Sequence, residues 1–252
     1  MSRMLEGRVA VITGASRARG IGKATARLFA DHGARVVITD VASESPVEAA
    51  AEIGREHLGL VCDVRDKAAC QHVAERVLAW GGRLDILVNN AGVTQKRTVE
   101  EISPDDFDLV TDVSLRGTLY MSQSVIPAMK AQHRGSIICI SSLSALQGGG
   151  VFGGAHYCAA KAGVLGLARA MARELGPDGI RVNSITPGLT VTDFSRGGST
   201  DERKNEMAKG YPLGRPGQPA EIASVCLFLA SDLASYVTGV TVDANGGSFI
   251  HA

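Results

Sequence analysis

The sequence has no excess of charge of either sign and few cysteines. Lys plus Arg and Asp plus Glu each number 26, so the formal net charge is zero and no general field attracts nucleic acid or an anionic membrane. The cysteines contain no Cys-x-x-Cys pair and leave one over after any pairing, which predicts reduced thiols and a cytoplasmic location. They are Cys62, Cys70, Cys139, Cys158 and Cys226.

Long apolar runs and targeting signals are also missing. No apolar stretch approaches the roughly 18 residues that would suggest a membrane span. The first residues, MSRMLEGRVAVITG, lack the apolar stretch and cleavage site of a secretory signal. The histidines show no metal-ligand spacing, so we expect no metal site. We expect a protein that stays where it is made, with a small-molecule substrate and neither nucleic acid nor membrane as a partner.

Short runs rich in Val and Ile alternate with helical patterns along the chain. Near-continuous apolar runs are typical of strands that have helices on both faces of their sheet. Alternating strands and helices favour a parallel, doubly wound sheet, because each crossover then packs right-handedly. We therefore predict one α/β domain spanning residues 1–252 with about seven parallel strands. The seven runs are residues 9–13, 35–39, 58–64, 85–90, 136–141, 180–185 and 240–244.

Helix starts and one long irregular segment complete the outline. Residues 45–48 (SPVE) read as a capping box with Pro at the first helical position, and Ser103-Pro104 followed by two acidic residues predicts a second helix start. The segment at about residues 189–217 is rich in glycine and proline and has one charged stretch. Because so long a segment inside a compact domain usually has a function, we predict a substrate loop with one short helix.

A glycine-rich loop separates the first predicted strand from the first predicted helix. Glycines allow a tight turn and close approach of the backbone to a pyrophosphate, which would lie at the positive helix N-terminus. Such a loop alone is a weak signal, but its position between a first strand and a first helix favours nucleotide binding. The residues expected to bind are Gly14, Ser16, Arg17, Gly20, Ile21 and Gly22.

Asp40 ends the second predicted strand, twenty residues after Gly20. A carboxylate at this place accepts hydrogen bonds from both hydroxyls of the adenosine ribose and repels a 2′-phosphate, which predicts NAD as the cofactor. Two alternatives stay open. Asp40 could simply cap the next helix, and the guanidinium of Arg17 or Arg19 could hold the 2′-phosphate of NADP.

With these motifs in order, the chain resembles the short-chain dehydrogenase/reductase family along essentially its whole length. The motifs are the Thr13-Gly14 loop, Asp63, Asn89-Asn90-Ala91-Gly92, Ser142, Tyr157-x-x-x-Lys161 and Pro187-Gly188. The resemblance implies a Rossmann-type fold, a homotetramer and hydride transfer at a carbinol carbon. It also implies further cofactor contacts, from the adenine to the nicotinamide carboxamide, at Asp63, Val64, Asn90, Ala91, Gly92, Val113, Pro187, Gly188, Thr190 and Thr192.

Two departures from the family pattern affect the site. Gly14 and Gly20 enclose five residues where the family usually has three, so we expect Ala18 and Arg19 to bulge outward. The family's catalytic asparagine falls at Ser114. A hydroxyl there could still hold a relay water, which keeps Ser114 as a candidate whose role is open.

Tyr157 and Lys161 lie on the same side of a predicted helix because they are four residues apart. A free phenol titrates near pH 10, so a base at neutral pH needs a pKa lower by about 2 to 3 units. One ammonium at about 4 Å supplies about 4 kcal/mol at an effective dielectric near 20, which is enough. We expect Lys161 to lower the pKa of Tyr157 and to hydrogen-bond the nicotinamide ribose. Taken alone, such a pair is usually a surface aromatic and a solvated cation, and only the other motifs favour catalysis.

A serine near the end of the fifth predicted strand is expected to bind the substrate oxygen. Ser142 follows this strand and should project at its carboxyl end, where ligands bind in open α/β sheets. Ser141 and Ser144 are rivals, and the family's usual spacing to the tyrosine would select Ser144. We favour Ser142 and treat the glycine run at residues 148–154 as two residues longer than usual.

The expected pocket mixes polar and apolar side chains, from which we infer a small carbonyl compound or polyol, such as a sugar. Arg196 leaves room for an anionic group. An NADPH-dependent 3-oxoacyl reductase is the nearest alternative, and a non-catalytic nucleotide sensor is the alternative from another class. A Ser-His-Asp hydrolase is disfavoured because no Gly-x-Ser-x-Gly elbow occurs. His156 would either touch substrate or face solvent. The expected lining is Thr94, Gln95, residues 143–147, Phe152, His156, Leu189 and Phe194.

Overall fold

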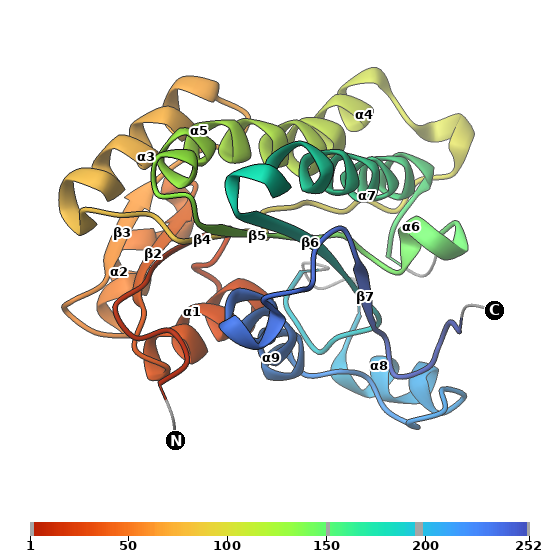
Figure 1. Cartoon of the computed structure of the whole chain (residues 1–252). Coiled ribbons are helices and arrows are strands. Elements are labelled where there is room, and N and C mark those ends of the chain that lie inside the picture. The colour runs from red at the N-terminus through yellow and green to blue at the C-terminus, as the bar shows by residue number, and fades with distance from the viewer. Residues whose placement is uncertain (1–2, 150–151, 195–198, 251–252) are drawn as a thin grey trace.

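Seven parallel strands form one twisted sheet in the computed structural model, which describes residues 3–149, 152–194 and 199–250 (Figure 1). The order across the sheet is β3-β2-β1-β4-β5-β6-β7. The predicted fold class is therefore confirmed. The strands are β1 (Val9–Thr13), β2 (Arg35–Asp40), β3 (Leu58–Val61), β4 (Ile86–Asn89), β5 (Gly135–Ile140), β6 (Ile180–Pro187) and β7 (Thr241–Ala244).

Helices cover both faces of the sheet. One apolar core lies between the sheet and α1, α2 and α9, and a second lies between the sheet and α3, α5 and α7. The helices are α1 (Ile21–Asp31), α2 (Pro46–Ala51), α3 (Lys67–Gly81), α4 (Pro104–Thr111), α5 (Gly117–Ala131), α6 (Ser144–Gln147), α7 (Ala155–Leu175), α8 (Asp201–Ala208) and α9 (Pro219–Ala230). Short 3₁₀ turns lie at Ala42–Glu44, Val99–Glu101, Gly176–Asp178 and Asp232–Ala234, and a π-helical turn, η3, spans Asp112–Arg116.

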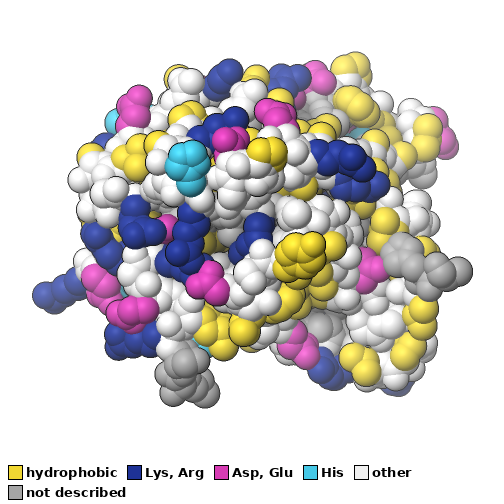
Figure 2. Space-filling view, viewed as in Figure 1, with side chains coloured by type: hydrophobic (Ala, Val, Ile, Leu, Met, Phe, Trp, Pro, Cys, Tyr) yellow, Lys and Arg dark blue, Asp and Glu magenta, His cyan; other side chains and the backbone are white. Residues whose placement is uncertain are grey.

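The inner strands are nearly unbroken apolar runs because both of their faces are buried, whereas the edge strands β3 and β7 are only partly buried. All five residues of β1 are buried, and Val11 pairs with Val37 of β2 and with Leu87 of β4. Each such side chain stabilises the fold by about 1.5 to 3 kcal/mol when it leaves water. Most charged side chains lie on the surface, where Figure 2 shows positive and negative groups interspersed on the face viewed. Among the described residues, no helix has the length and apolar character needed to span a bilayer.

The two predicted helix starts have different outcomes. Ser103 caps α4 as predicted, since its side chain accepts from the Asp106 amide while the Asp106 carboxylate accepts from the Ser103 amide. The capping box at Ser45 is wrong: this residue has φ 50° and ψ 62°, and its side chain makes no capping hydrogen bond. Helix α2 still begins at Pro46, because proline fixes a helical φ at a first position that needs no amide donor.

The order of the strands reverses between β1 and β4, which places a crevice at their carboxyl ends. Chain connections leave β1 toward β2 on one side and reach β4 on the other. Ligands of doubly wound sheets bind at such a switch point. The predicted substrate loop follows β6, and the described part of this loop contains one helix, α8, as expected. The fold therefore brings the glycine-rich loop, the ends of β4 and β5, and this loop to one edge of the sheet.

Candidate active site

The glycine-rich loop is locked against the end of β4. Gly14 has φ +61°, and a Cβ on it would lie 2.7 Å from the Ala91 Cα, so a side chain is excluded by both conformation and contact. The Asn90 side-chain amide donates to the carbonyl oxygens of Thr13 at 2.9 Å and Gly14 at 2.8 Å. A Cβ on Gly22 would lie 2.6 Å from this same amide nitrogen. Glycine at both positions lets backbone and ligand meet at the N-terminus of α1.

The two extra residues of this loop project outward, as predicted. Ala18 and Arg19 are exposed, in a turn closed by a 2.9 Å hydrogen bond from the Gly20 amide to the Arg17 carbonyl. The guanidinium of Arg19 pairs with Asp201 at 2.5 Å and lies 3.6 Å from Asp193. Both carboxylates belong to the substrate loop. The insertion therefore joins the glycine-rich loop to the substrate loop.

Asp40 lies at the carboxyl end of β2 and faces the pocket. One of its carboxylate oxygens accepts from the Ser16 amide at 3.1 Å and the other from the Val41 amide at 3.0 Å. Burial raises the pKa of Asp40, against these two hydrogen bonds. The alternative that Asp40 caps the next helix is wrong, because the following turn at Ala42–Glu44 has Val41 at its N-cap position.

The guanidinium of Arg17 is already engaged. It forms an ion pair of 2.6 Å with Glu44, and this contact is the main reason that the pKa of Arg17 is raised. Glu44 also lines the pocket, so two carboxylates, Asp40 and Glu44, stand at the end of β2. The positive charge of Arg17, which could have attracted a 2′-phosphate, is thus compensated by the carboxylate of Glu44.

One pocket of about 670 Å³ joins these groups to the predicted catalytic residues. Lining residues that the sequence singled out are Gly14, Arg17, Gly20, Ile21, Asp40, Asp63, Val64, Asn90, Ala91, Gly92, Val113, Ser142, Tyr157, Lys161, Pro187, Gly188, Thr190 and Thr192. The expected substrate contacts Thr94, Gln95, Leu143, Ser144, Gln147, Phe152, Leu189 and Phe194 also line it. Ser16, Gly22, Ser114, Ala145, Leu146 and His156 do not belong to its lining.

Several lining residues were not foreseen from the sequence. They include Cys62, Glu44, Arg65, Asp193, Lys204, Met207 and Tyr211. Cys62 directly precedes Asp63, so its adjacency to a motif residue was an available signal. Arg65 holds Asp63 in an ion pair of 2.6 Å, which lowers the pKa of that carboxyl. Lys204 lies in a strongly polar stretch of sequence that resembles a solvated helix face, so nothing in the pattern separates it from its exposed neighbours.

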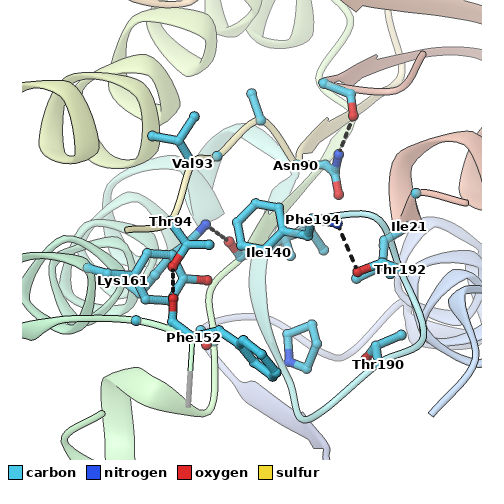
Figure 3. Close-up of a pocket in the computed structure, with 18 of the residues that line it drawn as sticks. Ile21, Asn90, Val93, Thr94, Ile140, Phe152, Lys161, Thr190, Thr192 and Phe194 are labelled. Atoms are coloured by element: carbon cyan, nitrogen blue, oxygen red, sulfur yellow. Dashed lines mark hydrogen bonds between the residues drawn. The ribbon is translucent and has the colours of Figure 1, made fainter. Parts of the chain in front are cut away.

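Tyr157, Lys161 and Ser142 meet at the wall of the pocket near the end of β5. Tyr157 and Lys161 are 7% and 3% exposed, which excludes the alternative of a surface aromatic and a solvated cation. The Lys161 ammonium donates to the carbonyl oxygen of Ile140 at 2.8 Å and lies 6.0 Å from the centre of the Tyr157 ring (Figure 3). The Ser142 hydroxyl accepts from the Ser144 amide at 3.1 Å, which directs its own proton elsewhere.

The geometry separates the three candidate serines. Of the three, only the Ser142 side chain acts on the Tyr157 phenol, whose pKa it lowers in the manner of a side-chain hydrogen bond. The Ser141 hydroxyl points away and donates to the Lys161 carbonyl at 2.7 Å. Ser144 lines the pocket as the first residue of α6. Proximity to Tyr157 therefore favours Ser142, in line with its position at the strand end.

The expected lowering of the Tyr157 pKa by Lys161 is wrong for this arrangement. Burial raises the pKa of Tyr157 to about 12, and the hydrogen bond from Ser142 only partly offsets it. Burial also lowers the pKa of Lys161 to about 8. The reason is that desolvation dominates for both groups, while the ammonium is held by Ile140 rather than directly beside the phenol oxygen. Near neutral pH the phenol of Tyr157 is thus protonated, and the pKa of Lys161 lies close to this pH range.

Ser114 lies in the π-helical turn η3, fully buried behind Gly92. A Cβ on Gly92 would be 3.3 Å from the Lys161 ammonium and 3.6 Å from the Ser114 hydroxyl, so both polar groups converge on this glycine. The Ser114 hydroxyl has no hydrogen-bond partner among the described residues. Its carbonyl accepts from the Thr118 hydroxyl at 2.8 Å. Ser114 is therefore placed near Lys161 but behind the pocket surface.

Two other expectations lie around Tyr157. His156 neither faces solvent nor lines the pocket: it is 1% exposed, and its Nε2 lies 3.2 Å from the Gln95 side-chain oxygen. Phe194 of the substrate loop lies over Tyr157, with ring centres 6.2 Å apart. Arg196, expected to meet an anionic group, lies outside the described residues. Among the described residues, no cluster of three His, Cys, Asp or Glu side chains has the arrangement of a metal site.

The residues present fit a dinucleotide. The cradle between Gly14, Gly22 and Asn90 would be filled by any Cβ, and the buried hydroxyl of Ser16 has no partner among the described residues. Such a loop between a first strand and a first helix is the usual holder of a pyrophosphate. Together with the buried Tyr157 and Lys161 on the same pocket, these features define a dinucleotide-binding α/β protein.

Comparison with known proteins gives the same class. The family described as enoyl-(acyl carrier protein) reductase matches residues 14–248. An uncharacterized short-chain type dehydrogenase/reductase of Sinorhizobium fredii is 50% identical over 252 residues, covering 98% of this chain and 100% of the relative. The 3-oxoacyl-(acyl-carrier-protein) reductase FabG of Thermotoga maritima is 41% identical over 249 residues, covering 98% of this chain and 99% of that protein.

A solved structure agrees with these sequence relatives. A short-chain type dehydrogenase/reductase from Mycobacterium marinum superposes with a TM-score of 0.91 at 33% identity, covering 99% of this chain and 98% of that one. The chain belongs to the short-chain dehydrogenase/reductase family. It is an oxidoreductase of that family, which uses a nicotinamide cofactor.

Proposed function

We propose that this oxidoreductase transfers a hydride between NAD(H) and a secondary alcohol or ketone, with Tyr157 as its acid/base. The observation that carries the proposal is the convergence of buried Tyr157, Ser142 and Lys161 on a pocket that the glycine-rich loop also lines. A nicotinamide ring held between Pro187 and Thr192 would supply or accept the hydride. The residues of the chain then bind the carbonyl, orient it and move one proton.

The protonation states favour reduction near neutral pH. Tyr157 is protonated, because burial raises its pKa to about 12, and it donates this proton to the carbonyl oxygen as the carbon receives the hydride. Ser142 donates to the same oxygen and stabilises the charge that develops there. The ammonium of Lys161 stabilises the phenolate that forms. The same groups run alcohol oxidation in reverse, with Tyr157 taking the hydroxyl proton.

Asp40 and Glu44 support NAD over NADP. A carboxylate has about four lone-pair sites, and the Asp40 carboxylate uses two of them on the Ser16 and Val41 amides. Two remain for the two hydroxyls of the adenosine ribose. A 2′-phosphate would meet the negative charge of Asp40 instead, while Arg17 is bound to Glu44. The nearby carboxylates therefore disfavour the phosphorylated cofactor.

The lining of the substrate end supports a small polar carbonyl compound or polyol, including a sugar. Thr94, Gln95, Ser144 and Gln147 offer hydrogen bonds there, and Phe152 and Phe194 offer apolar contact. A second candidate, reduction of a 3-oxoacyl thioester, is favoured by the similarity to FabG. Its expected preference for NADPH distinguishes it from the first candidate.

The test is a spectrophotometric assay of the purified chain with NADH or NADPH against small ketones, ketoses and an acetoacetyl thioester. We expect turnover with NADH. Tyr157→Phe removes the proton donor, so turnover should fall by about 10² to 10⁴-fold while NADH affinity is retained. Binding of NADH with no turnover on any carbonyl compound would favour a nucleotide sensor. A preference for NADPH with the thioester would establish the second candidate.

A double variant tests the preference for NADH over NADPH. In Asp40→Ser/Glu44→Gln the negative charge at the end of β2 is removed and Arg17 is released. We expect the ratio of kcat/KM for NADH to that for NADPH to fall at least about tenfold, since a carboxylate about 4 Å from a phosphate costs roughly 1 to 4 kcal/mol. An unchanged ratio would show that the ribose does not lie at Asp40. Glu75→Gln, at an exposed acidic residue of α3 outside the pocket lining, serves as the control.

Assembly and location complete the proposal. We infer a homotetramer, as the family resemblance implies, supported by exposed apolar side chains such as Phe107 of α4 and Val99 just before it. Light scattering in solution tests this assembly, and a monomeric mass would refute it. All five cysteines are free, which supports a reducing compartment such as the cytoplasm.

A further inference from the structure

A buried lysine from the substrate loop lines the pocket and has no carboxylate partner among the residues that the structure describes. Lys204 of α8 is 3% exposed, and its ammonium donates to the carbonyl oxygen of Thr192 at 2.6 Å. It forms no ion pair with a carboxylate of the described ranges, 3–149, 152–194 and 199–250. The two acidic side chains that act on it through charge, Asp193 and Asp201, are both paired with Arg19.

Such an ammonium is costly to bury. It has three N–H donors, of which the Thr192 carbonyl takes one, and the other two have no partner within the part of the chain that the structure describes. Burial accordingly lowers the pKa of Lys204. A buried cation is usually paired, and a cation in the wall of a ligand pocket can be paired by the ligand. This situation calls for an anionic group in the pocket.

The position of Lys204 indicates which anionic group it meets. Its partner Thr192 is followed by Asp193, whose carbonyl accepts from the Arg17 guanidinium at 3.4 Å. This part of the substrate loop therefore lies against the glycine-rich loop. Figure 3 draws Thr192 and Ile21, the first residue of α1, on the same side of the pocket. The N-terminus of α1 is where the pyrophosphate of a dinucleotide is expected.

We propose that the Lys204 ammonium binds the pyrophosphate of the dinucleotide, so that the substrate loop itself supplies a cationic contact to the cofactor. The proposal rests on the proposed function only in assigning a dinucleotide to this pocket. The glycine-rich loop presents backbone amides from one side, and Lys204 approaches from α8 on the other. Arg19 acts as a positioning residue, since it keeps Asp193 and Asp201 from pairing with Lys204.

The experiment compares Lys204→Met with Lys209→Met. Lys209 directly follows the same helix as its C-cap, but its side chain is 69% exposed and pairs only with Glu206 among the described residues, so it controls for loss of a loop cation. Dissociation constants are measured by fluorescence for NADH and by its displacement for ADP-ribose and adenosine. In Lys204→Met we expect NADH and ADP-ribose to bind about 10- to 100-fold more weakly, as for a lost hydrogen bond to a charged group, with adenosine unchanged. Lys209→Met should bind all three normally.

Several results would overturn the proposal. Unchanged ADP-ribose binding in Lys204→Met would refute the proposal, and a loss of turnover on an anionic substrate in the same variant would place the ammonium at the substrate instead. Equal weakening of adenosine would indicate a general disturbance of the pocket, which a thermal melt and the milder Lys204→Gln variant would identify. Failure of the native chain to bind ADP-ribose would also refute it. Normal ADP-ribose binding without turnover on any carbonyl compound would refute only the proposed function.

A salt titration gives a second, independent measure. Binding of an ammonium to a diphosphate weakens as salt screens the charges. The ADP-ribose affinity of the native chain should therefore fall with added salt more steeply than that of Lys204→Met, and parallel slopes would contradict the proposal. Adenosine carries no charge and should respond little in either protein.

Discussion

The two ends of the pocket are held by different forces. At the nucleotide end, the buried Thr13 hydroxyl accepts from the amides of Asn90 and Ala91 at 3.0 Å, and the Asn90 side chain bonds back to the glycine-rich loop. At the substrate end, the loop after β6 is tied to the rest of the chain by ion pairs such as Arg19 with Asp201, whose side chains are 49% and 42% exposed.

This difference separates the end of the pocket that positions the nucleotide from the end that controls access of the ligand. Buried hydrogen bonds are expensive to leave unmade, whereas exposed ion pairs contribute little and are weakened by salt. We therefore expect the nucleotide end to keep its shape while the substrate loop opens and closes over the ligand. Lys204 and Phe194 belong to the loop but meet the pocket, so closing of the loop would bring a cation and an aromatic ring to the ligands together.

The largest expected effect comes from a side chain at Gly14. Gly14→Ala places a Cβ 2.7 Å from the Ala91 Cα in a backbone with φ +61°. Strain of about 1 to 2 kcal/mol and overpacking of about 1 to 3 kcal/mol should add in the free energy of unfolding. We also expect NADH binding to be lost, because the loop can no longer meet the end of β4. Denaturant unfolding and NADH fluorescence measure the two effects.

Gly214 provides a matched control at the other end. It has φ +65°, but a Cβ built on it would meet nothing within 4 Å. Gly214→Ala should therefore show only the conformational strain, about 1 to 2 kcal/mol, and retain NADH binding. Equal destabilisation by the two variants would mean that contact with Ala91 is unimportant, and the contrast between the two ends would fail.

The same contrast explains what the sequence could predict. The strands, the glycine-rich loop and Asp40 follow from local patterns, because apolar runs, glycine and a strand-end acid have fixed places in a doubly wound sheet. Ser142 could also be placed, from its position after β5. The capping box at Ser45 failed because the chain enters α2 through a left-handed residue, which a motif of side chains does not report.

The remaining features depend on tertiary packing. Lys204 and the partners of Arg19 depend on how the substrate loop folds back over the pocket, which brings residues together across 182 positions of sequence in the pair of Arg19 with Asp201. The spacing of Tyr157 and Lys161 gave their common side of α7 but not their desolvation. The pKa values of the two groups depend on their burial and on the group to which the Lys161 ammonium donates, here the Ile140 carbonyl.

A second prediction concerns the pH dependence at the catalytic wall. Burial lowers the pKa of Lys161 to about 8, so the ammonium is present below this pH and lost above it. Loss of the charge makes the Tyr157 phenolate harder to form as the proton leaves for the carbonyl. We expect kcat/KM for reduction to be level below pH 8 and to fall toward tenfold per pH unit above it, as measured in steady-state kinetics.

Controls separate Lys161 from other groups that titrate. The pKa of Tyr157 itself is about 12, so its own titration falls beyond this range. Lys204→Met removes the other buried ammonium in the pocket wall, and the break near pH 8 should persist in that variant. A level profile up to pH 10 would show that catalysis does not need a protonated Lys161.

The smallest expected effect comes from the exposed ion pairs between the glycine-rich loop and the substrate loop. Arg19→Met removes the ion pairs with Asp193 and Asp201. Because these pairs are exposed to solvent, they contribute little, and KM for the ketone should rise only about two- to fivefold at low salt. High salt should raise KM of the native chain toward that of the variant. Arg3→Met is a suitable control, because Arg3 makes a comparable exposed pair with Glu6 remote from the pocket lining. A rise in KM much greater than tenfold, with the ADP-ribose affinity unchanged, would mean that Arg19 itself contacts the ketone, whereas a weaker ADP-ribose affinity would mean that Asp193 or Asp201 now pairs with Lys204. An unchanged KM at low salt would mean that the substrate loop is held by its buried contacts, and the two ends of the pocket would then be alike.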